Sequence, residues 1–97
     1  MSIQIVVVFD VVPERFDMAV DAFGELARRT SEEPGALRFD AYVSAEKANT
    51  VVLVEEWADQ NAIDLHMKED CVRDFLAKVD GAFRGEPAVH RLSSIDA

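Results

Sequence analysis

The first segment of the chain that can form a β-strand, residues 3–12, is apolar on both of its faces. Side chains alternate along a strand, so each face carries every second residue. The first face carries five apolar side chains, those of Ile3, Ile5, Val7, Phe9 and Val11. The second face carries Val6 and Val8. A strand of this kind needs a covering layer on each side, which restricts the folds that the chain can adopt.

The remaining elements follow in a regular order. After the first strand come a helix begun by Pro13, the turn Pro34-Gly35, a hairpin of two strands, a second helix broken near residues 68–70, and a last strand. The first helix and the last three strands are expected at residues 13–30, 37–43, 51–57 and 88–92. The order β-α-β-β-α-β is typical of the ferredoxin-like fold.

We therefore predict an α+β domain that spans residues 1–97 as a single unit. Its four-stranded antiparallel sheet should carry both helices on one face, which leaves the opposite face uncovered. Hydrophobic residues make up 49% of the chain, a high share for 97 residues. Two sheets packed face to face would bury this surface. We expect a homodimer with the architecture of a dimeric α+β barrel.

The charge of the chain limits its partners. Nineteen acidic residues against ten basic ones give a net charge of -9, which repels nucleic acid and anionic membrane surfaces. The longest apolar run, residues 5–9, is too short to span a bilayer, and the N-terminus lacks the pattern of a secretory signal. We expect a cytoplasmic protein that binds neither nucleic acid nor membrane. The single cysteine, Cys71, excludes an internal disulfide and a Cys-rich zinc site, and its helical position favours a packed residue.

Residues 51–66 bring an aromatic ring, carboxylates and a titratable base into one short unit. Alternation along the strand places Glu55 and Trp57 on the same face. Asp59 fits the N-cap of the following helix, and the apolar spacing after it sets His66 on the apolar side of that helix. A histidine in this position is either a packing residue or a catalytic group.

Several parts of the sequence together match a known pattern: the helix that starts at a proline, EEPGALRFDAYVS at residues 32–44, VEEW at 54–57 and AIDLH at 62–66. In this order the chain resembles the antibiotic biosynthesis monooxygenase superfamily over nearly its whole length. The resemblance implies a small dimeric α+β barrel with a pocket between the sheet and the helices of each subunit. It also implies several chemistries, because members oxygenate phenolic, quinol or anthrone-like substrates without metal or flavin, degrade haem, or isomerise a phosphorylated ketone.

For this chain we expect a cofactor-independent monooxygenase that oxidises a small aromatic, quinol- or anthrone-like metabolite, with no cofactor and no metal. Proton removal gives an enolate that can itself pass an electron to oxygen, so the site must supply a base, charge stabilisation and a dry pocket. His66 is the candidate base. Trp57 could stack on the substrate. Tyr42 and Arg38 could hydrogen-bond to it or stabilise an oxyanion, if they point into the same pocket.

Other interpretations stay open. Trp57 could anchor the core or a dimer interface, and Glu55 and Glu56 could pair with Arg38 across the hairpin. The segment LRFD at residues 37–40 is similar to the isomerase branch, so enolisation of a small hydroxyketone is an alternative, as is a dimer that binds a ligand without turnover. The haem-degrading relatives carry an Asn on the first strand, where this chain has none, so haem is not expected.

Overall fold

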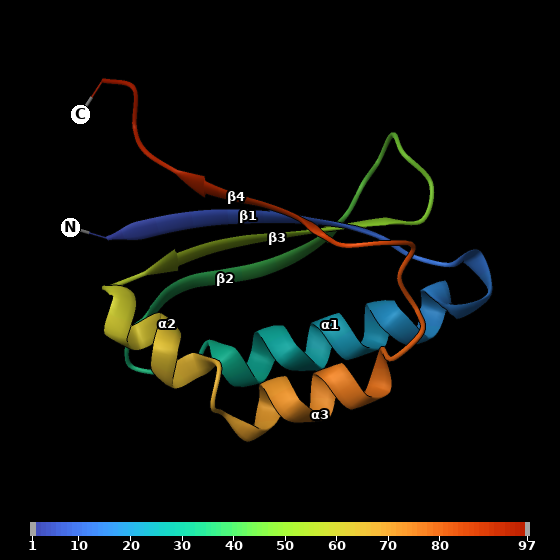
Figure 1. Ribbon diagram of the computed structural model, residues 1–97, viewed down its shortest axis with the longest axis horizontal. Helices are drawn as coiled ribbons and strands as arrows, with labels where there is room; N and C mark the ends of the chain where they lie inside the picture. Colours follow the sequence, from blue (N-terminus) through green and yellow to red (C-terminus); the bar gives the residue numbers. More distant parts are fainter. Residues whose placement is uncertain (1, 97) are drawn as a thin grey trace.

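The computed structural model describes residues 2–96. A four-stranded antiparallel sheet in the spatial order β2-β3-β1-β4 carries the helices on one face (Figure 1). The strands are β1 (Ile3–Asp10), β2 (Ala36–Val43), β3 (Thr50–Trp57) and β4 (Ala88–Leu92). The helices are the 3₁₀ turn η1 (Pro13–Arg15), α1 (Phe16–Thr30), α2 (Gln60–His66) and α3 (Asp70–Lys78). This order confirms the predicted ferredoxin-like α+β fold.

Both predicted helical regions form. The first begins at Pro13 and the second is broken near residues 68–70, as predicted. Pro13 opens the 3₁₀ turn that leads into α1, as its fixed φ and missing N–H favour. The second region divides into α2 and α3 between His66 and Asp70. Asp59 is the N-cap of α2, because its carboxylate accepts a hydrogen bond from the backbone N–H of Ala62 at 2.9 Å. Within residues 2–96, no helix combines the length and the apolar character that crossing a bilayer requires.

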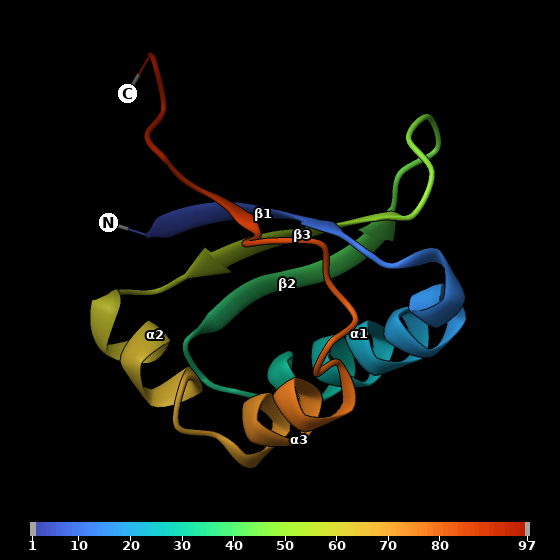
Figure 2. The same ribbon diagram turned by 45° about the vertical axis from the view of Figure 1, so that its right-hand side comes forward.

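The core lies between the sheet and the helices, as the two views of the ribbon show (Figures 1 and 2). The ring of Phe9 on β1 lies 4.8 Å from that of Phe23 on α1, measured between centroids. Phe23 in turn lies 4.8 Å from Phe75 on α3. Burial of one such side chain contributes about 1.5–3 kcal/mol to stability. These contacts fix both long helices against the centre of the sheet.

The other face of the sheet carries no helix from the described part of the chain (Figure 2). Valines of the two central strands pair across it, Val6 with Val54 and Val8 with Val52, and all four are only half-buried. The helices supply the covering layer expected on one face of the first strand, and the layer expected on the other face stays a prediction. Residues 2–96 of a single chain leave this second face partly exposed.

The turn between α1 and β2 packs directly against α2. The backbone N–H of Ala58 donates to the carbonyl of Gly35 at 2.9 Å. Gly35 approaches Ala62 so closely that a Cβ at position 35 would overlap the Cβ of Ala62. Glycine is required here because the two backbones meet with no room for a side chain. The contact brings Glu33, two residues before Gly35, next to His66 at the end of α2.

Candidate active site

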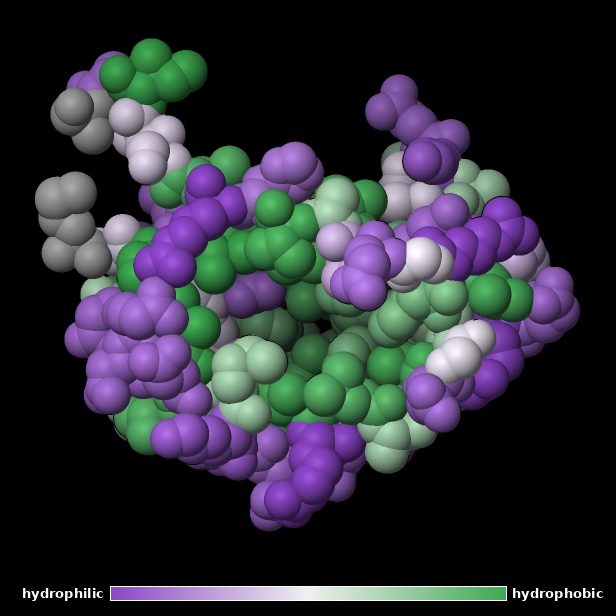
Figure 3. All heavy atoms as spheres, in the orientation of Figure 1, coloured by the Kyte–Doolittle hydropathy of each residue, from purple (hydrophilic) through white to green (hydrophobic). Residues whose placement is uncertain are grey.

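A cavity of about 490 Å³ lies between the helix-bearing face of the sheet and helices α2 and α3. Its wall is almost wholly apolar and includes Phe39, Leu53, Val72 and Phe75. Figure 3 shows the hollow in the middle of the molecule, with hydrophobic residues around it. Three wall residues at its mouth are more than half exposed, namely Met67, Leu76 and Val89. Volume and lining are those of a site for a small apolar ligand.

Only two titratable side chains of the described residues line this cavity, His66 and Glu55. His66 is the last residue of α2 and is 6% exposed. Glu55 points from β3 to the same side of the sheet as Trp57, as alternation along the strand predicted. The sequence-based expectation that a carboxylate, a tryptophan and a histidine come together is therefore met.

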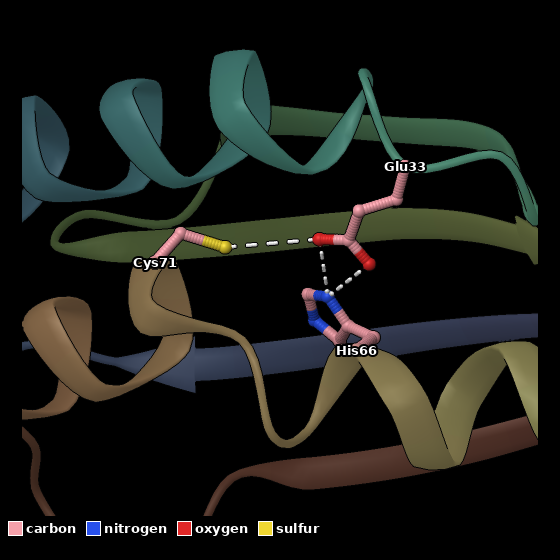
Figure 4. A group of neighbouring side chains, drawn as sticks. All are labelled: Glu33, His66 and Cys71. Atoms are coloured by element: carbon pink, nitrogen blue, oxygen red, sulfur yellow. Dashed lines mark hydrogen bonds and ion pairs between the residues drawn. The ribbon is translucent and has the colours of Figure 1, made fainter.

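His66 is held by a partly buried carboxylate. Its Nδ1 lies 3.1 and 3.0 Å from the two carboxylate oxygens of Glu33 (Figure 4). An ionised carboxylate can only accept, and opposite such a group Nδ1 is the nitrogen that carries the proton and donates it. The neutral ring then keeps its lone pair on Nε2. The side chains of His66 and Glu33 are 8% and 15% exposed, so water competes little for this contact. The pair has the geometry of a positioned general base.

Aromatic rings pack against the imidazole and fix its plane. The ring centroid of Trp57 lies 4.7 Å from that of His66, and Phe39 lies 5.6 Å from it. Trp57 is 1% exposed and donates its indole N–H to Oε1 of Glu55 at 2.8 Å. Trp57 thus belongs both to the core and to the cavity wall. Its ring contacts the imidazole of His66 directly.

The environment of Glu55 differs from that of a surface glutamate. Burial raises the pKa of Glu55, while the hydrogen bond from Trp57 and the nearby His66 lower it less. A carboxyl group of this kind keeps its proton to a higher pH and can then donate a hydrogen bond. The cavity therefore holds a candidate base, His66, and a candidate hydrogen-bond donor, the carboxyl group of Glu55.

Cys71, in the first turn of α3, lies on the far side of Glu33. Its thiol donates to Oε2 of Glu33 at 3.7 Å and lies 3.9 Å from the hydroxyl of Thr30. Burial raises the pKa of the Cys71 thiol. The side chain is 7% exposed and belongs to the core, in agreement with the packed residue that the sequence favoured.

Arg38 and Tyr42 do not point into this cavity. They lie opposite Glu56 and Val52 of β3, on the face of the sheet that carries no helix. Arg38 donates to Asp40 at 2.7 Å and to the Tyr42 hydroxyl at 3.1 Å. These contacts raise the pKa of the Arg38 guanidinium. The physical reason is the period of two along β2, because the face that buries Phe39 turns residues 38, 40 and 42 away from it.

The cross-hairpin ion pairs considered for Arg38 are also absent among residues 2–96. Its ion pair is with Asp40 on its own strand. Glu55 instead accepts from Trp57, and Glu56 accepts from Ser2 at 2.7 Å. Arg38 therefore forms its ion pair with Asp40 of β2, and with neither Glu55 nor Glu56 of β3.

Glu33 is the residue of the candidate site that the sequence pattern did not single out. It lies in the segment EEPG, in which the pattern predicts only a turn at Pro34-Gly35 after the first helix. Its neighbour Glu32 is exposed, and the sequence alone does not distinguish the two. The signal in the sequence was a carboxylate two residues before Gly35, since a glycine in a turn can allow a close contact with another backbone.

The fold and the cavity define a class of protein: a small ferredoxin-like α+β domain with an open-mouthed apolar pocket and a carboxylate-bound histidine. The family model of the antibiotic biosynthesis monooxygenases matches residues 2–78, and the chain belongs to this family. This agrees with the resemblance seen in the sequence. The match gives no support to the isomerase alternative.

Solved structures agree with this fold. An antibiotic biosynthesis monooxygenase shares 22% identity over 96% of this chain and 98% of its own, with a TM-score of 0.88. Rv0793 from Mycobacterium tuberculosis shares 22% identity over 100% of this chain and 98% of its own, with a TM-score of 0.89. A conserved protein from Methanosarcina mazei Go1 shares 21% identity over 95% and 91%, with a TM-score of 0.87. No protein of curated function matches the chain.

Proposed function

We propose that the protein is a cofactor-independent monooxygenase that oxidises a small, planar, anthrone- or quinol-like metabolite, with His66 as its base. The observation that carries this proposal is the pairing of Glu33 with His66, which lines a cavity of about 490 Å³ whose wall is apolar apart from His66 and Glu55. An apolar wall favours a flat aromatic substrate and excludes water from a reactive carbanion. Family membership supports the reaction class.

The proposed chemistry begins with proton transfer from an activated C–H of the substrate to Nε2 of His66. The resulting enolate gives one electron to O₂, and the two radicals combine to form a C–O bond. The peroxide takes the proton from His66. The peroxide then loses water. The second C–H proton leaves the carbon, the O–O bond breaks, and a carbonyl remains. A CH₂ group and O₂ thus yield C=O and H₂O, so the substrate itself supplies every electron.

Other cavity residues assist this step in our proposal. Glu33 holds the ring so that the lone pair of Nε2 is free for the substrate. Trp57 and Phe39 pack on the imidazole and keep it from turning. Glu55, when protonated, donates a hydrogen bond to the enolate oxygen. Glu55 therefore takes the part first considered for Arg38 and Tyr42, whose side chains lie on the other face of the sheet.

Oxygen uptake tests the proposal. Metal-stripped protein is assayed with a panel of anthrones and quinols, and wild type is compared with His66→Ala. A positioned general base contributes about a hundredfold to ten-thousandfold, so the rate should fall by that factor. Leu65→Ala is the matched control, because Leu65 is the exposed neighbour of His66 on α2 and lies outside the cavity and the proposed dimer face. Uptake that persists in His66→Ala, or that needs added flavin or metal, would contradict the proposal.

We also propose that the active form is a homodimer, formed through the sheet face that carries no helix. Half-buried Val6, Val8, Val52 and Val54 form an apolar strip at the centre of this face. A second sheet packed on it would remove the strip from water. The partner surface is then the same face of a second copy.

Sedimentation of the purified chain tests the dimer. The wild type should have twice the chain mass of 10.8 kDa. Val8→Lys places an ammonium between Val52 and Ala88 in the proposed interface, without a carboxylate directly opposite it, and should give monomer. Leu65→Lys is the matched control, since Leu65 is an exposed leucine on α2, outside this face. A wild-type monomer at micromolar concentration would refute the dimer. The cytoplasmic location stays a prediction.

A further inference from the structure

Three metal-binding side chains from three separate elements meet behind the cavity wall. Glu33 comes from the turn after α1, His66 ends α2 and Cys71 lies in the first turn of α3 (Figure 4). One carboxylate oxygen, one imidazole nitrogen and the thiol sulfur all lie within 4.8 Å of one another. His66 and Cys71 are buried, so their donor atoms are fixed by the surrounding core.

The spacing of these atoms suits a tetrahedral cation. Zinc takes bonds of about 2.0–2.1 Å to nitrogen, 2.0–2.2 Å to oxygen and 2.3 Å to sulfur, so tetrahedral angles separate O from N by about 3.3 Å and S from O by about 3.5 Å. The distances here are 3.0 Å from Glu33 Oε2 to His66 Nδ1 and 3.7 Å from Cys71 Sγ to Oε2. The sulfur and the imidazole nitrogen lie within 4.8 Å of each other, against about 3.5 Å in a tetrahedral site, so the ion would draw these two side chains together by as much as about 1 Å.

The charges of the three ligands also match a divalent cation. A carboxylate and a thiolate carry two negative charges between them, and the imidazole is neutral when it binds through its lone pair. A dication would thus be neutralised in a buried site, which keeps the cost of desolvation low. The mixed N, O and S donor set favours Zn²⁺ over Mg²⁺ or Ca²⁺, which take oxygen ligands.

A route from solvent reaches this cluster without passing through the cavity. A surface groove of about 340 Å³ is lined by Glu33 together with Asp59, Ala62 and Glu69. Its carboxylates and the net charge of -9 attract cations. An ion can therefore approach Glu33 from outside the molecule.

We propose that Glu33, His66 and Cys71 form a binding site for a thiophilic divalent cation of the Zn²⁺ type, with a fourth position open to water. The site does not rest on the proposed oxygenase activity. A cation on Nδ1 takes the place of the ring proton there, so the neutral ring carries its proton on Nε2. His66 cannot bind the cation through Nδ1 and keep a free lone pair on Nε2 at the same time. The bound cation would therefore inhibit a base at this position.

Metal titration of the purified chain tests this site. Zn²⁺ is titrated against a chromogenic chelator, and Co²⁺ is followed by the near-ultraviolet charge-transfer band that a thiolate ligand produces. The wild type should bind one ion per chain and show this band. Cys71→Ser should lose the band and bind at least tenfold more weakly. Glu33→Gln should weaken binding at least tenfold and keep the band at saturating Co²⁺.

Controls separate ligation from folding. His90→Ala and Glu32→Gln change an exposed histidine and an exposed carboxylate, and both should bind as the wild type does. Urea unfolding and circular dichroism report whether the nearly isosteric variants at positions 71 and 33 stay folded. No binding at micromolar Zn²⁺, or wild-type affinity in folded Cys71→Ser and Glu33→Gln, would overturn the proposal.

Discussion

Replacing Glu33 with glutamine should change the position of the proton on the ring of His66. In the wild type, two acceptor oxygens at 3.0 and 3.1 Å leave Nδ1 no role except that of donor. Hydrogen bonds to charged groups contribute about 1.5–3 kcal/mol. Because 1.36 kcal/mol is a factor of ten, this contribution corresponds to a preference of about tenfold to 150-fold for the tautomer with the proton on Nδ1.

Glutamine at position 33 removes the reason for this preference. Its amide offers one acceptor and one donor, so it can bond to either tautomer of His66 by turning over. A neutral hydrogen bond contributes about 0.5–1.5 kcal/mol in both arrangements, and the two tautomers should then lie within about fivefold of each other. The lone pair of Nε2 would be present for only part of the neutral population.

Long-range nitrogen–proton NMR correlations of the neutral rings measure this ratio without any substrate. His90, exposed on β4, gives an internal control that Glu33→Gln should not alter. A wild-type His66 with its proton mainly on Nε2 would refute the reasoning. The same conclusion would follow if the ratio were unchanged in folded Glu33→Gln.

Two further predictions concern stability. Burial raises the pKa of Glu55 above its ordinary 4.5, so the folded state binds this proton more tightly and the free energy of unfolding falls as pH rises from 4.5 through the raised value. Glu55→Gln should flatten this fall, as urea unfolding across the pH series would show; an unchanged slope would contradict it. Gly35→Ala should destabilise by about 1–3 kcal/mol, because the new Cβ overlaps Ala62. Gly24→Ala, whose Cβ would meet only the Arg28 side chain at 3.5 Å, should stabilise by about 0.5–1 kcal/mol; equal effects on unfolding would refute the contact argument.

The fold could be predicted because its determinants are local and repeat along the chain. Alternation over residues 51–57 placed Glu55 and Trp57 on one face, and the helical spacing placed His66 on the apolar side of α2. The structure brings these three residues together around one cavity. The face on which each of these residues lies follows from the period of its own strand or helix, so it could be predicted from the sequence.

The rest of the site depends on contacts that no period encodes. Alternation separated Arg38 and Tyr42 from Phe39, but which face of β2 meets the helices is decided by packing across the sheet. Glu33 reaches His66 only because Gly35 lets two backbones touch. Residues 33 and 66 lie far apart in sequence, and one close approach between turn and helix determines their contact.

Glu33 and His66 lie in a wall with a hollow on either side, since His66 borders the cavity and Glu33 borders the surface groove. Substrate would enter at the mouth formed by Met67, Leu76 and Val89. The proton on Nδ1 points to Glu33 and hence toward the groove, not toward the cavity. When the ring takes up a second proton from the substrate, its positive charge is compensated by a carboxylate that meets solvent in the groove. The cavity itself needs no counter-charge and can stay dry through the reaction.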